Sequence, residues 1–360
     1  MKKLEYVAVD VGYGFVKVIS SNGKKVLFPS VVGSGRERML ANFLDEKEQE
    51  ETDLSEIHIK LNGKHYFIGE MALKNSTDGS RVFERERYNH EYSQILMHAA
   101  IQLVVEKGTE EVVLFTGLPL SYMESQKDKF KQKLLQETIN IEWITGKTKG
   151  QKQIVIKEAY IFPQGFSALW ATLLNHEGKT TNKDLFAEGN QIAVIDIGFR
   201  TTDLCVIEMQ DNASFKALAP FSDTLDQGVV NLYENIKVAY RNQTGGQDLS
   251  ENKIKRILSQ KNISYKGKKI DLTEEVREAH ESVANAINDR INKLWKDESD
   301  TFDHIYVVGG GGSLFMDYLQ SNFDNRLESI VASQFANAIG YYRIGKIMIG
   351  DIPSTKVATG

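Results

Sequence analysis

Two aspartates occupy the same position in two similar stretches of the chain. Asp10 ends an apolar run two residues before Gly12, and Asp196 ends another apolar run two residues before Gly198. After each glycine the chain turns and resumes as a second apolar run, which is typical of two strands joined by a short turn. Backbone N–H groups at such a turn can bind a phosphate. A carboxylate at the end of the first strand can then hold a cation or a water molecule against that phosphate.

The repetition of this pattern strengthens the prediction. A single Asp before a glycine turn often only supports the turn. Two such hairpins that face each other would instead place one carboxylate on either side of a polyphosphate. Because Mg²⁺ keeps several water ligands in proteins, we expect Asp10 and Asp196 to act on it mainly through its hydration shell. Two copies of one hairpin also predict two related halves.

Other residues near the two turns have types that suit a phosphate. Glycines permit close backbone approach, a lysine adds a cation, threonines can donate hydroxyl hydrogen bonds, and a further acid can hold a water. These candidates are Gly12, Gly14, Lys17, Gly198, Thr201, Thr202 and Asp203. A solvated strand residue remains the alternative for the lysine, and ordinary strand propensity for the threonines.

A run of four glycines follows a third apolar strand, expected over 305–308. It comprises Gly309, Gly310, Gly311 and Gly312. Because consecutive glycines cost backbone entropy, the run indicates that a flat group such as adenine or ribose lies against the chain, with a flexible loop as the alternative. A dinucleotide-binding fingerprint is excluded, because no acid follows the glycines at the expected spacing.

Composition limits the class of protein. The 360 residues are 41% hydrophobic and 26% charged, which suits an ordinary globular chain with room for two domains. The net charge of −5 argues against a generally basic nucleic-acid binder, although a local basic patch stays open. One cysteine, Cys205, lies in an apolar strand, and there is neither an apolar leader nor a run of about 20 apolar residues. The sequence therefore predicts a cytoplasmic protein.

The predicted elements alternate between strands and helices, as in an α/β core. Asn22-Gly23 predicts a tight turn within an antiparallel N-terminal meander, and Pro163 is expected to open a helix that runs to 174. The strongly acidic stretch over 36–56 predicts a mobile surface excursion. The other expected elements are a hairpin over 57–61 and 65–68, strands over 112–118 and 154–156, a loop over 175–190, and helices over 89–106, 121–134, 226–241, 250–260, 273–296 and 333–346.

Five segments, taken in order, resemble the motifs of the actin-like ATPase superfamily, which includes actin, the seventy-kilodalton heat-shock chaperones and sugar kinases. They are 10–17 and 196–203 for the two phosphate motifs, 163–165 and 336–340 for the two connecting helices, and 307–311 for the adenosine motif. Within the superfamily, the stretches 68–72, 115–120 and 333–340 are similar to ones in the ParM/StbA-type actins of bacteria and archaea. The resemblance spans nearly the whole chain.

The resemblance implies an α/β fold of two ribonuclease-H-like domains in an actin-like arrangement, with a nucleotide cleft between them. Domain I is expected over 1–162, joined by a returning helix at about 333–360, and domain II over 163–332. The implied activity is an ATPase that polymerises with bound nucleotide and hydrolyses it in the filament. Such proteins often move plasmid DNA through a DNA-bound adaptor, so neither direct nucleic-acid contact nor a membrane is expected.

The resemblance also implies roles for single residues. Gln164 would orient the water that attacks the γ-phosphate, although Glu158, a stronger base near the same junction, competes for that role. Arg200 stands where many relatives carry glycine and would contact the β-phosphate instead. Further nucleotide contacts are implied at Tyr13, Gly228, Lys253 and Arg256, with a solvated helix face as the alternative for the last two. The implied cofactors are Mg²⁺ and ATP, with GTP left open.

Two other functions remain open from the sequence. A small-metabolite kinase of the same superfamily would need an acid as the substrate's base, and Glu158 or Asp203 would have to serve. A non-polymerising nucleotide switch of the chaperone type is the other alternative. The expected lack of a substrate domain after residue 360 counts against it.

Overall fold

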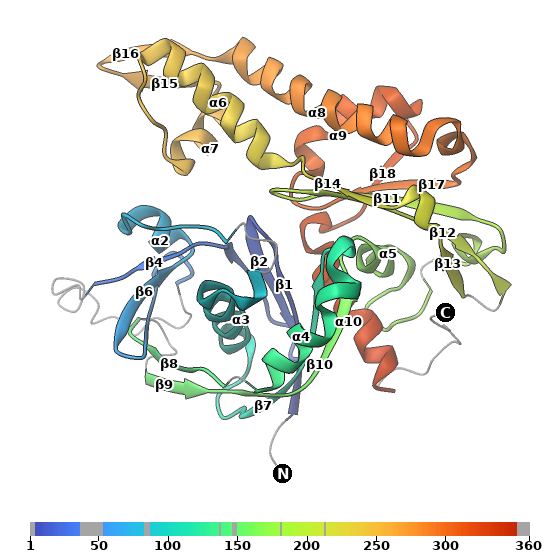
Figure 1. Cartoon of the computed structure of the whole chain (residues 1–360), viewed down its shortest axis with the longest axis horizontal. Helices are drawn as coiled ribbons and strands as arrows, with labels where there is room; N and C mark the ends of the chain where they lie inside the picture. Colours follow the sequence, from blue (N-terminus) through green and yellow to red (C-terminus); the bar gives the residue numbers. More distant parts are fainter. Residues whose placement is uncertain are drawn as a thin grey trace. The chain divides into compact units, whose positions relative to one another are not determined.

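A computed structural model describes residues 4–36, 53–82, 87–136, 138–145, 150–180, 182–211 and 214–350. The described residues form two compact units (Figure 1). The first unit contains the chain up to Trp170 and a returning segment from Asn337, and the second contains Ala171 to Ala336. Most of the predicted acidic excursion over 36–56 lies outside the described residues. Within the described part of the chain, no helix is long and apolar enough to cross a membrane.

The first unit is built on a five-stranded sheet with the order β10-β7-β1-β2-β3. The first three strands along the chain form the predicted antiparallel meander, and β7 and β10 extend the sheet in parallel with β1. The bounds are β1 Leu4–Val11, β2 Phe15–Ser20, β3 Lys25–Pro29, β7 Glu111–Leu118 and β10 Val155–Pro163. The sheet brings the carboxyl ends of three parallel strands to one edge, which is where α/β proteins bind ligands.

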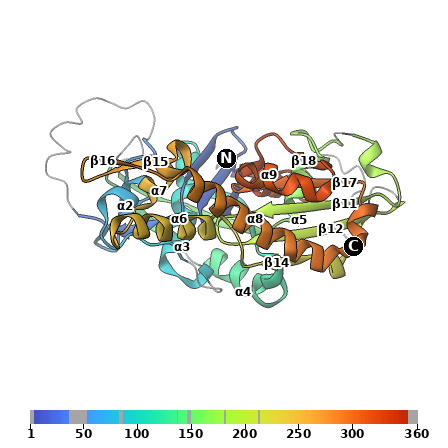
Figure 2. The ribbon, with the colours of Figure 1, turned by 90° about the horizontal axis from the view of Figure 1, so that it is seen from above.

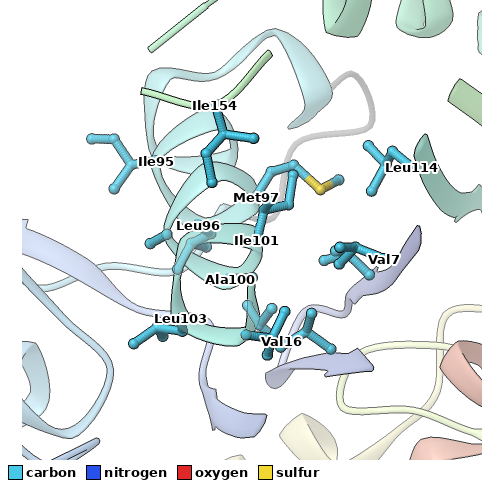
Figure 3. Close-up of a cluster of buried hydrophobic side chains, with 14 of the residues drawn as sticks. Val7, Val16, Ile95, Leu96, Met97, Ala100, Ile101, Leu103, Leu114 and Ile154 are labelled. Atoms are coloured by element: carbon cyan, nitrogen blue, oxygen red, sulfur yellow. The ribbon is translucent and has the colours of Figure 1, made fainter. Parts of the chain in front are cut away.

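Helices cover both faces of this sheet. Val7 and Val9 of β1 join the cluster under α3 (Glu91–Val104), which Figure 3 shows with Ile101 and Leu114. Ala8, between the two valines, points to the opposite face and joins a cluster with Tyr341 of α10 (Ala336–Met348). Because neighbouring strand residues point to opposite faces, an unbroken apolar strand is buried on both sides.

A second sheet in the first unit has the order β4-β6-β5-β8-β9. Its bounds are β4 Val32–Ser34, β5 Ile57–Leu61, β6 Lys64–Ile68, β8 Asn140–Trp143 and β9 Gly150–Gln153. The hairpin expected over 57–61 and 65–68 is thereby confirmed. Two further helices of this unit are α2 Glu70–Asn75 and α4 Met123–Gln136.

The second unit repeats the main sheet of the first, with the order β13-β12-β11-β17-β18. Again three strands form an antiparallel meander, and two more extend the sheet in parallel with its first strand. The bounds are β11 Gln191–Ile197, β12 Thr202–Met209, β13 Phe215–Ala217, β17 His304–Val308 and β18 Leu327–Ser329, while β14 Asp223–Leu225 pairs with β12. The prediction of two related halves is therefore confirmed.

Helices between the strands complete the second unit. Figures 1 and 2 show α6 and α8 side by side, and α8 also packs against α9. The bounds are α6 Val229–Thr244, α7 Glu251–Gln260, α8 Thr273–Trp295 and α9 Gly312–Gln320, with a small hairpin of β15 Asn262–Tyr265 and β16 Lys268–Asp271. Neither that hairpin nor α9 was expected from the sequence.

One predicted helix start is wrong. Pro163 is the last residue of β10 and does not open a helix, because the strand continues well past the expected 154–156. The helix α5 (Phe166–Leu173) begins only after Gly165, whose φ of 76° makes the turn. Proline is tolerated there because β10 is an edge strand of the sheet, where a missing N–H leaves no neighbouring strand unpaired. The consequence is that Gln164 lies in a strand-to-helix turn.

Burial of His98 in α3 makes a pH-dependent contribution to stability. The side chain is 1% exposed, and within the described residues neither ring nitrogen has a hydrogen-bond partner. Burial lowers the pKa of His98 from 6.5 to about 4, so the folded protein binds fewer protons than the unfolded chain between these values. The neutral His98 therefore lowers the free energy of unfolding little above pH 6.5, and this free energy falls as the pH drops from 6.5 toward 4.

The expected loss from this histidine is about 2 kcal/mol between pH 7 and pH 5. Urea denaturation of the wild type and of His98→Leu at both pH values measures it. The leucine variant should lose about 2 kcal/mol less than the wild type over that interval. An identical pH dependence of both proteins would show that the folded state accommodates a charged His98.

Candidate functional site

The first hairpin gathers two hydrogen-bond donors around a buried carboxylate. Asp10 is 3% exposed and lies opposite Lys17 in the β1–β2 register. Lys17 Nζ is 2.9 Å from Asp10 Oδ2, and Gln164 Nε2 donates to Asp10 Oδ1 at 3.1 Å. A buried carboxylate is stable only with such partners. Three residues that the sequence singled out separately thus form one cluster.

The turn after Asp10 depends on a glycine because the chain approaches itself closely. Gly12 N donates to Phe15 O at 3.1 Å. A Cβ on Gly12 would lie 2.8 Å from that same oxygen, and real Cβ atoms essentially never approach so closely. The tight turn therefore excludes other residues at this position.

Two residues that the sequence did not indicate bind the carbonyls of this turn. Ser30 Oγ donates to Gly12 O at 2.7 Å, and its backbone N–H donates to Gly14 O. Arg81 Nη1 donates to Tyr13 O at 3.1 Å and also to Gly14 O. With its carbonyls bound from within the protein, the turn is suited to an anion at its N–H groups. The Tyr13 side chain is buried, so a contact of this residue with a ligand would come from its backbone.

Backbone and side-chain bonds fix the position of Gln164 at the strand-to-helix turn. Its N–H donates to Leu118 O at 2.8 Å, and the next amide, Gly165 N, donates to Asn337 Oδ1 at 3.1 Å. The Gln164 side chain is buried against Asp10, with 9% of the residue exposed. Asn337, from the returning helix α10, lies in the segment 336–340 that the resemblance singled out, but the sequence did not suggest this contact.

Glu158, the competitor for the role of Gln164, lies far from Asp10. It is aligned with Val113 in β7, which is aligned with Tyr6 in β1, four residues before Asp10. At about 3.3 Å per strand residue, this corresponds to roughly 13 Å along the sheet. Glu158 is exposed and accepts a hydrogen bond from Tyr160 Oη at 2.8 Å. Of the two candidates, only Gln164 contacts Asp10.

The second hairpin repeats the turn of the first. Gly198 N donates to Thr201 O at 2.8 Å, and a Cβ on Gly198 would lie 2.9 Å from that oxygen. Asp196 is 6% exposed and lies opposite Asp203 in the β11–β12 register. Thr224 Oγ1, which the sequence did not indicate, donates to Asp203 Oδ1 at 2.6 Å. The two hairpins therefore share both the buried acid and the glycine turn.

Two residues predicted to contact the nucleotide also have contacts inside the protein. Thr202 is fully buried, and its Oγ1 donates to Gln227 O at 2.8 Å. Gly228 permits close packing, because a Cβ there would lie 2.8 Å from Phe199 O. The first amides of α6 bind the carbonyls of the Gly198 turn, with Val230 N 2.7 Å from Phe199 O. Thr202 and Gly228 thus have structural roles in holding the hairpin.

Three predicted cations lie at the surface of the second unit. Arg200 Nε is 3.9 Å from Asp226 Oδ1 at the turn. Lys253 and Arg256 are exposed on one face of α7, where Arg256 Nε donates to Gln260 Oε1 at 2.8 Å. Contacts of these three side chains with a nucleotide stay predictions.

The glycine run has a structural reason at two of its positions. Gly309 has a φ of 86°, and a Cβ there would lie 2.4 Å from Asp196 Oδ1. Gly311 N donates to Ile197 O at 2.8 Å, and a Cβ on Gly311 would be 2.6 Å from Ile197 Cγ2. A Cβ on Gly310 has no neighbour nearer than 3.7 Å. Of these three, Gly310 is therefore the one whose lack of a side chain is not explained by packing, and its contact with a flat ligand stays a prediction.

Alanine substitutions should separate these two kinds of glycine. Gly309→Ala forces a left-handed residue against the Asp196 carboxylate and is expected to cost about 2–4 kcal/mol. Gly310→Ala should stay within about 0.5 kcal/mol of the wild type, but should weaken ADP binding if the purine lies there. Thermal unfolding and titration calorimetry measure the two effects. A stable Gly309→Ala variant would contradict the packing argument.

Two family models match large parts of the chain. Residues 8–166 match the family model for the N-terminal domain of actin-like proteins, and residues 194–321 match that for the C-terminal domain of the archaeal MreB-like actin homologue. An archaeal actin homologue of Thermoplasma volcanium is 26% identical, with 93% of this chain and 97% of that protein covered.

Solved structures show the same fold. A ParM filament from Clostridium botulinum is 28% identical, with a TM-score of 0.84, and covers 96% of this chain and 100% of that one. An archaeal actin homologue in complex with ADP is 22% identical, with a TM-score of 0.75 over 95% of this chain and 99% of that one. The two-unit α/β fold predicted from the sequence is thus confirmed, and the chain belongs to the actin-like superfamily, with ParM-like proteins and archaeal actin homologues among its relatives.

Proposed function

We propose that this protein is a filament-forming ATPase that binds magnesium–ATP through its two Asp-Xaa-Gly hairpins. The observation that carries the proposal is the buried Asp10 carboxylate with Lys17 and Gln164 bonded to it, at a turn that recurs at Asp196. The ADP complex of an archaeal relative and the ParM filament support nucleotide binding and self-association.

Gln164 is the residue proposed to position the attacking water. Its Nε2 donates to Asp10 Oδ1, so the side chain is oriented, and the amide oxygen supplies the acceptor for a water proton. A neutral amide is a weak base. The rate must therefore come from holding the water in line with the γ-phosphate and from stabilising charge on the phosphate, as in other phosphoryl transfers.

The charged residues of the two hairpins have complementary roles in this proposal. Lys17 lies directly beside Asp10 and supplies a positive charge for the phosphates. Mg²⁺ neutralises phosphate charge when it is bound. Among the residues that the structure describes, no group of three or more His, Cys, Asp or Glu could hold a metal ion. Asp10 and Asp196 would hold a bound Mg²⁺ through water molecules of its hydration shell.

The cellular role is a further step of the same proposal. Assembly with bound ATP and disassembly after hydrolysis would let the protein move plasmid or other DNA through an adaptor in the cytoplasm. Slow hydrolysis that accelerates on assembly is expected, because a site that works by positioning responds to small shifts of its parts.

Sedimentation of the purified protein with magnesium and either ATP or ADP tests this function. We expect a pelleted fraction with ATP that is much smaller with ADP and is lost in Asp10→Ala. Phosphate release measured in the same samples should rise with the pelleted fraction. A protein that stays in the supernatant and releases ADP only when a sugar or another hydroxyl acceptor is added would instead be a metabolite kinase.

A further inference from the structure

The stretch 252–270 concentrates positive charge in an acidic protein. It contains seven Lys or Arg side chains and neither Asp nor Glu. Because the whole chain carries −5, the rest of it carries −12. We propose that this stretch, termed the basic segment, binds the phosphate backbone of nucleic acid. Its cations are Lys253, Lys255, Arg256, Lys261, Lys266, Lys268 and Lys269.

The fold presents these cations on a small projecting structure. The basic segment comprises most of α7 and of the β15–β16 hairpin, which pack against each other. Figures 1 and 2 show both at one end of the second unit, away from its sheet. The hairpin turns at Lys266 and Gly267, whose φ values of 48° and 78° produce a tight reversal.

The hairpin carries positive charge at its tip and on both faces. Lys268 lies opposite Tyr265 and Lys269 opposite Ser264, so the two lysines point to opposite sides of the ribbon. Both are exposed, as are Lys261 and Lys266. A ribbon with cations on every side can lie along a groove or backbone in more than one orientation, which suits binding without base specificity.

Two acids flank the basic segment, and each offsets the charge of one lysine in it. Glu251 pairs with Lys255 at 3.4 Å, before the segment begins. Asp271 follows the segment, and its pKa is lowered mainly by hydrogen bonds from the hydroxyl and backbone of Thr273 and to a lesser extent by the charge of Lys269. Arg256 donates to the neutral Gln260. Most of the positive charge is therefore available to a ligand.

The chemistry of the surface favours nucleic acid over a folded protein or a membrane. Interfaces between folded proteins are depleted in lysine and enriched in aromatic residues around an apolar core. Membrane-surface helices need exposed large apolar side chains. None of the exposed large hydrophobic residues in the described chain lies in the basic segment, and Ile254 and Ile257 of α7 are buried. A phosphate backbone needs only accessible cations and is bound through counterion release.

This inference revises an expectation from the net charge. A chain of −5 is not a generally basic nucleic-acid binder, but a total charge averages over the basic segment and hides it. Two cations of the basic segment, Lys253 and Arg256, are also predicted nucleotide contacts. Lys261, Lys266, Lys268 and Lys269 are outside the predicted nucleotide contacts, so binding of nucleic acid and of ADP can be measured separately.

Fluorescence anisotropy with a labelled DNA duplex of about 30 base pairs and arbitrary sequence tests the proposal. The full chain should bind at about 50 mM NaCl and lose affinity steeply by about 200 mM. Changing the four lysines at 261, 266, 268 and 269 to Gln should weaken binding at least about tenfold and lower the salt slope by about 3. ADP affinity, measured by calorimetry, should stay within about threefold of the wild type, since these lysines are not among the predicted contacts.

A matched control variant has the same change in net charge, but at four lysines of the first unit. Lys64, Lys107, Lys127 and Lys129 are all exposed in the first unit, and their replacement by Gln should leave duplex affinity nearly unchanged. The proposal is overturned if the wild type does not bind duplex at low salt, or if both quadruple variants lose affinity equally. Tighter binding to poly-glutamate or to vesicles with phosphatidylserine would likewise overturn the assignment to nucleic acid.

Discussion

Replacing Gln164 by alanine is expected to slow ATP hydrolysis about 100-fold while leaving ADP affinity within about threefold. The substitution removes the amide that Asp10 orients, but leaves both phosphate hairpins and the Lys17–Asp10 pair in place. A water that is no longer held in line must find the attack geometry by chance, so the loss should appear in turnover rather than in binding. Phosphate-release kinetics and titration calorimetry separate the two.

Glu158→Gln is the matched control for this prediction. Glu158 is the other residue proposed from the sequence to orient the attacking water. It is exposed and lies roughly 13 Å from Asp10 as measured along the strands. The hydrolysis rate of the variant should equal that of the wild type. Should Gln164→Ala retain full turnover while Glu158→Gln loses it, the proposed roles of the two residues would have to be exchanged.

The second large effect is expected at the crossing of α5 and α10. A Cβ on Gly340 would lie 1.7 Å from Ser167 O, an overlap that only a backbone shift can relieve. Overpacking of this kind costs about 1–3 kcal/mol and occasionally more, whereas alanine gains about 1 kcal/mol of helix propensity over glycine. We expect a net loss of about 2 kcal/mol for Gly340→Ala, or roughly 5 °C in Tm.

Thermal unfolding measures this loss, with Gly310→Ala as the control for the same chemical change. A Cβ on Gly310 has no neighbour nearer than 3.7 Å, so its Tm should match that of the wild type. An unchanged Tm in Gly340→Ala would mean that the two helices separate without cost, and that the close crossing does not constrain the returning helix.

The parts of the fold that could be predicted are those with a local signal. Asp10 and Asp196 were found because each ends an apolar run before a glycine, and the two repeated sheets follow from that repetition. The helical spacing of apolar residues and the residue types at turns also predicted most helices to within a few residues of their bounds. Pro163 was misplaced because a proline at a strand end and one in a first helical turn have the same neighbours in sequence.

The parts that could not be predicted depend on contacts between distant residues. Ser30 and Arg81 bind the first turn, but neither stands in a pattern that marks it. Asn337 binds the amide after Gln164, and the resemblance covers its segment without giving it a role. Gly309 and Gly311 looked like a ligand surface, yet their lack of a side chain is explained by β11 pressing against them. Local sequence patterns predict turns. The residues that bind a turn are distant in sequence, so local patterns do not predict them.

A crystal structure of the protein with magnesium and a non-hydrolysable ATP analogue would show whether both hairpins bind one nucleotide. We expect one nucleotide whose phosphates contact the turns after both Asp10 and Asp196, with a water between Gln164 and the γ-phosphate. A nucleotide bound to one hairpin alone, or at another surface with both turns unoccupied, would contradict this expectation.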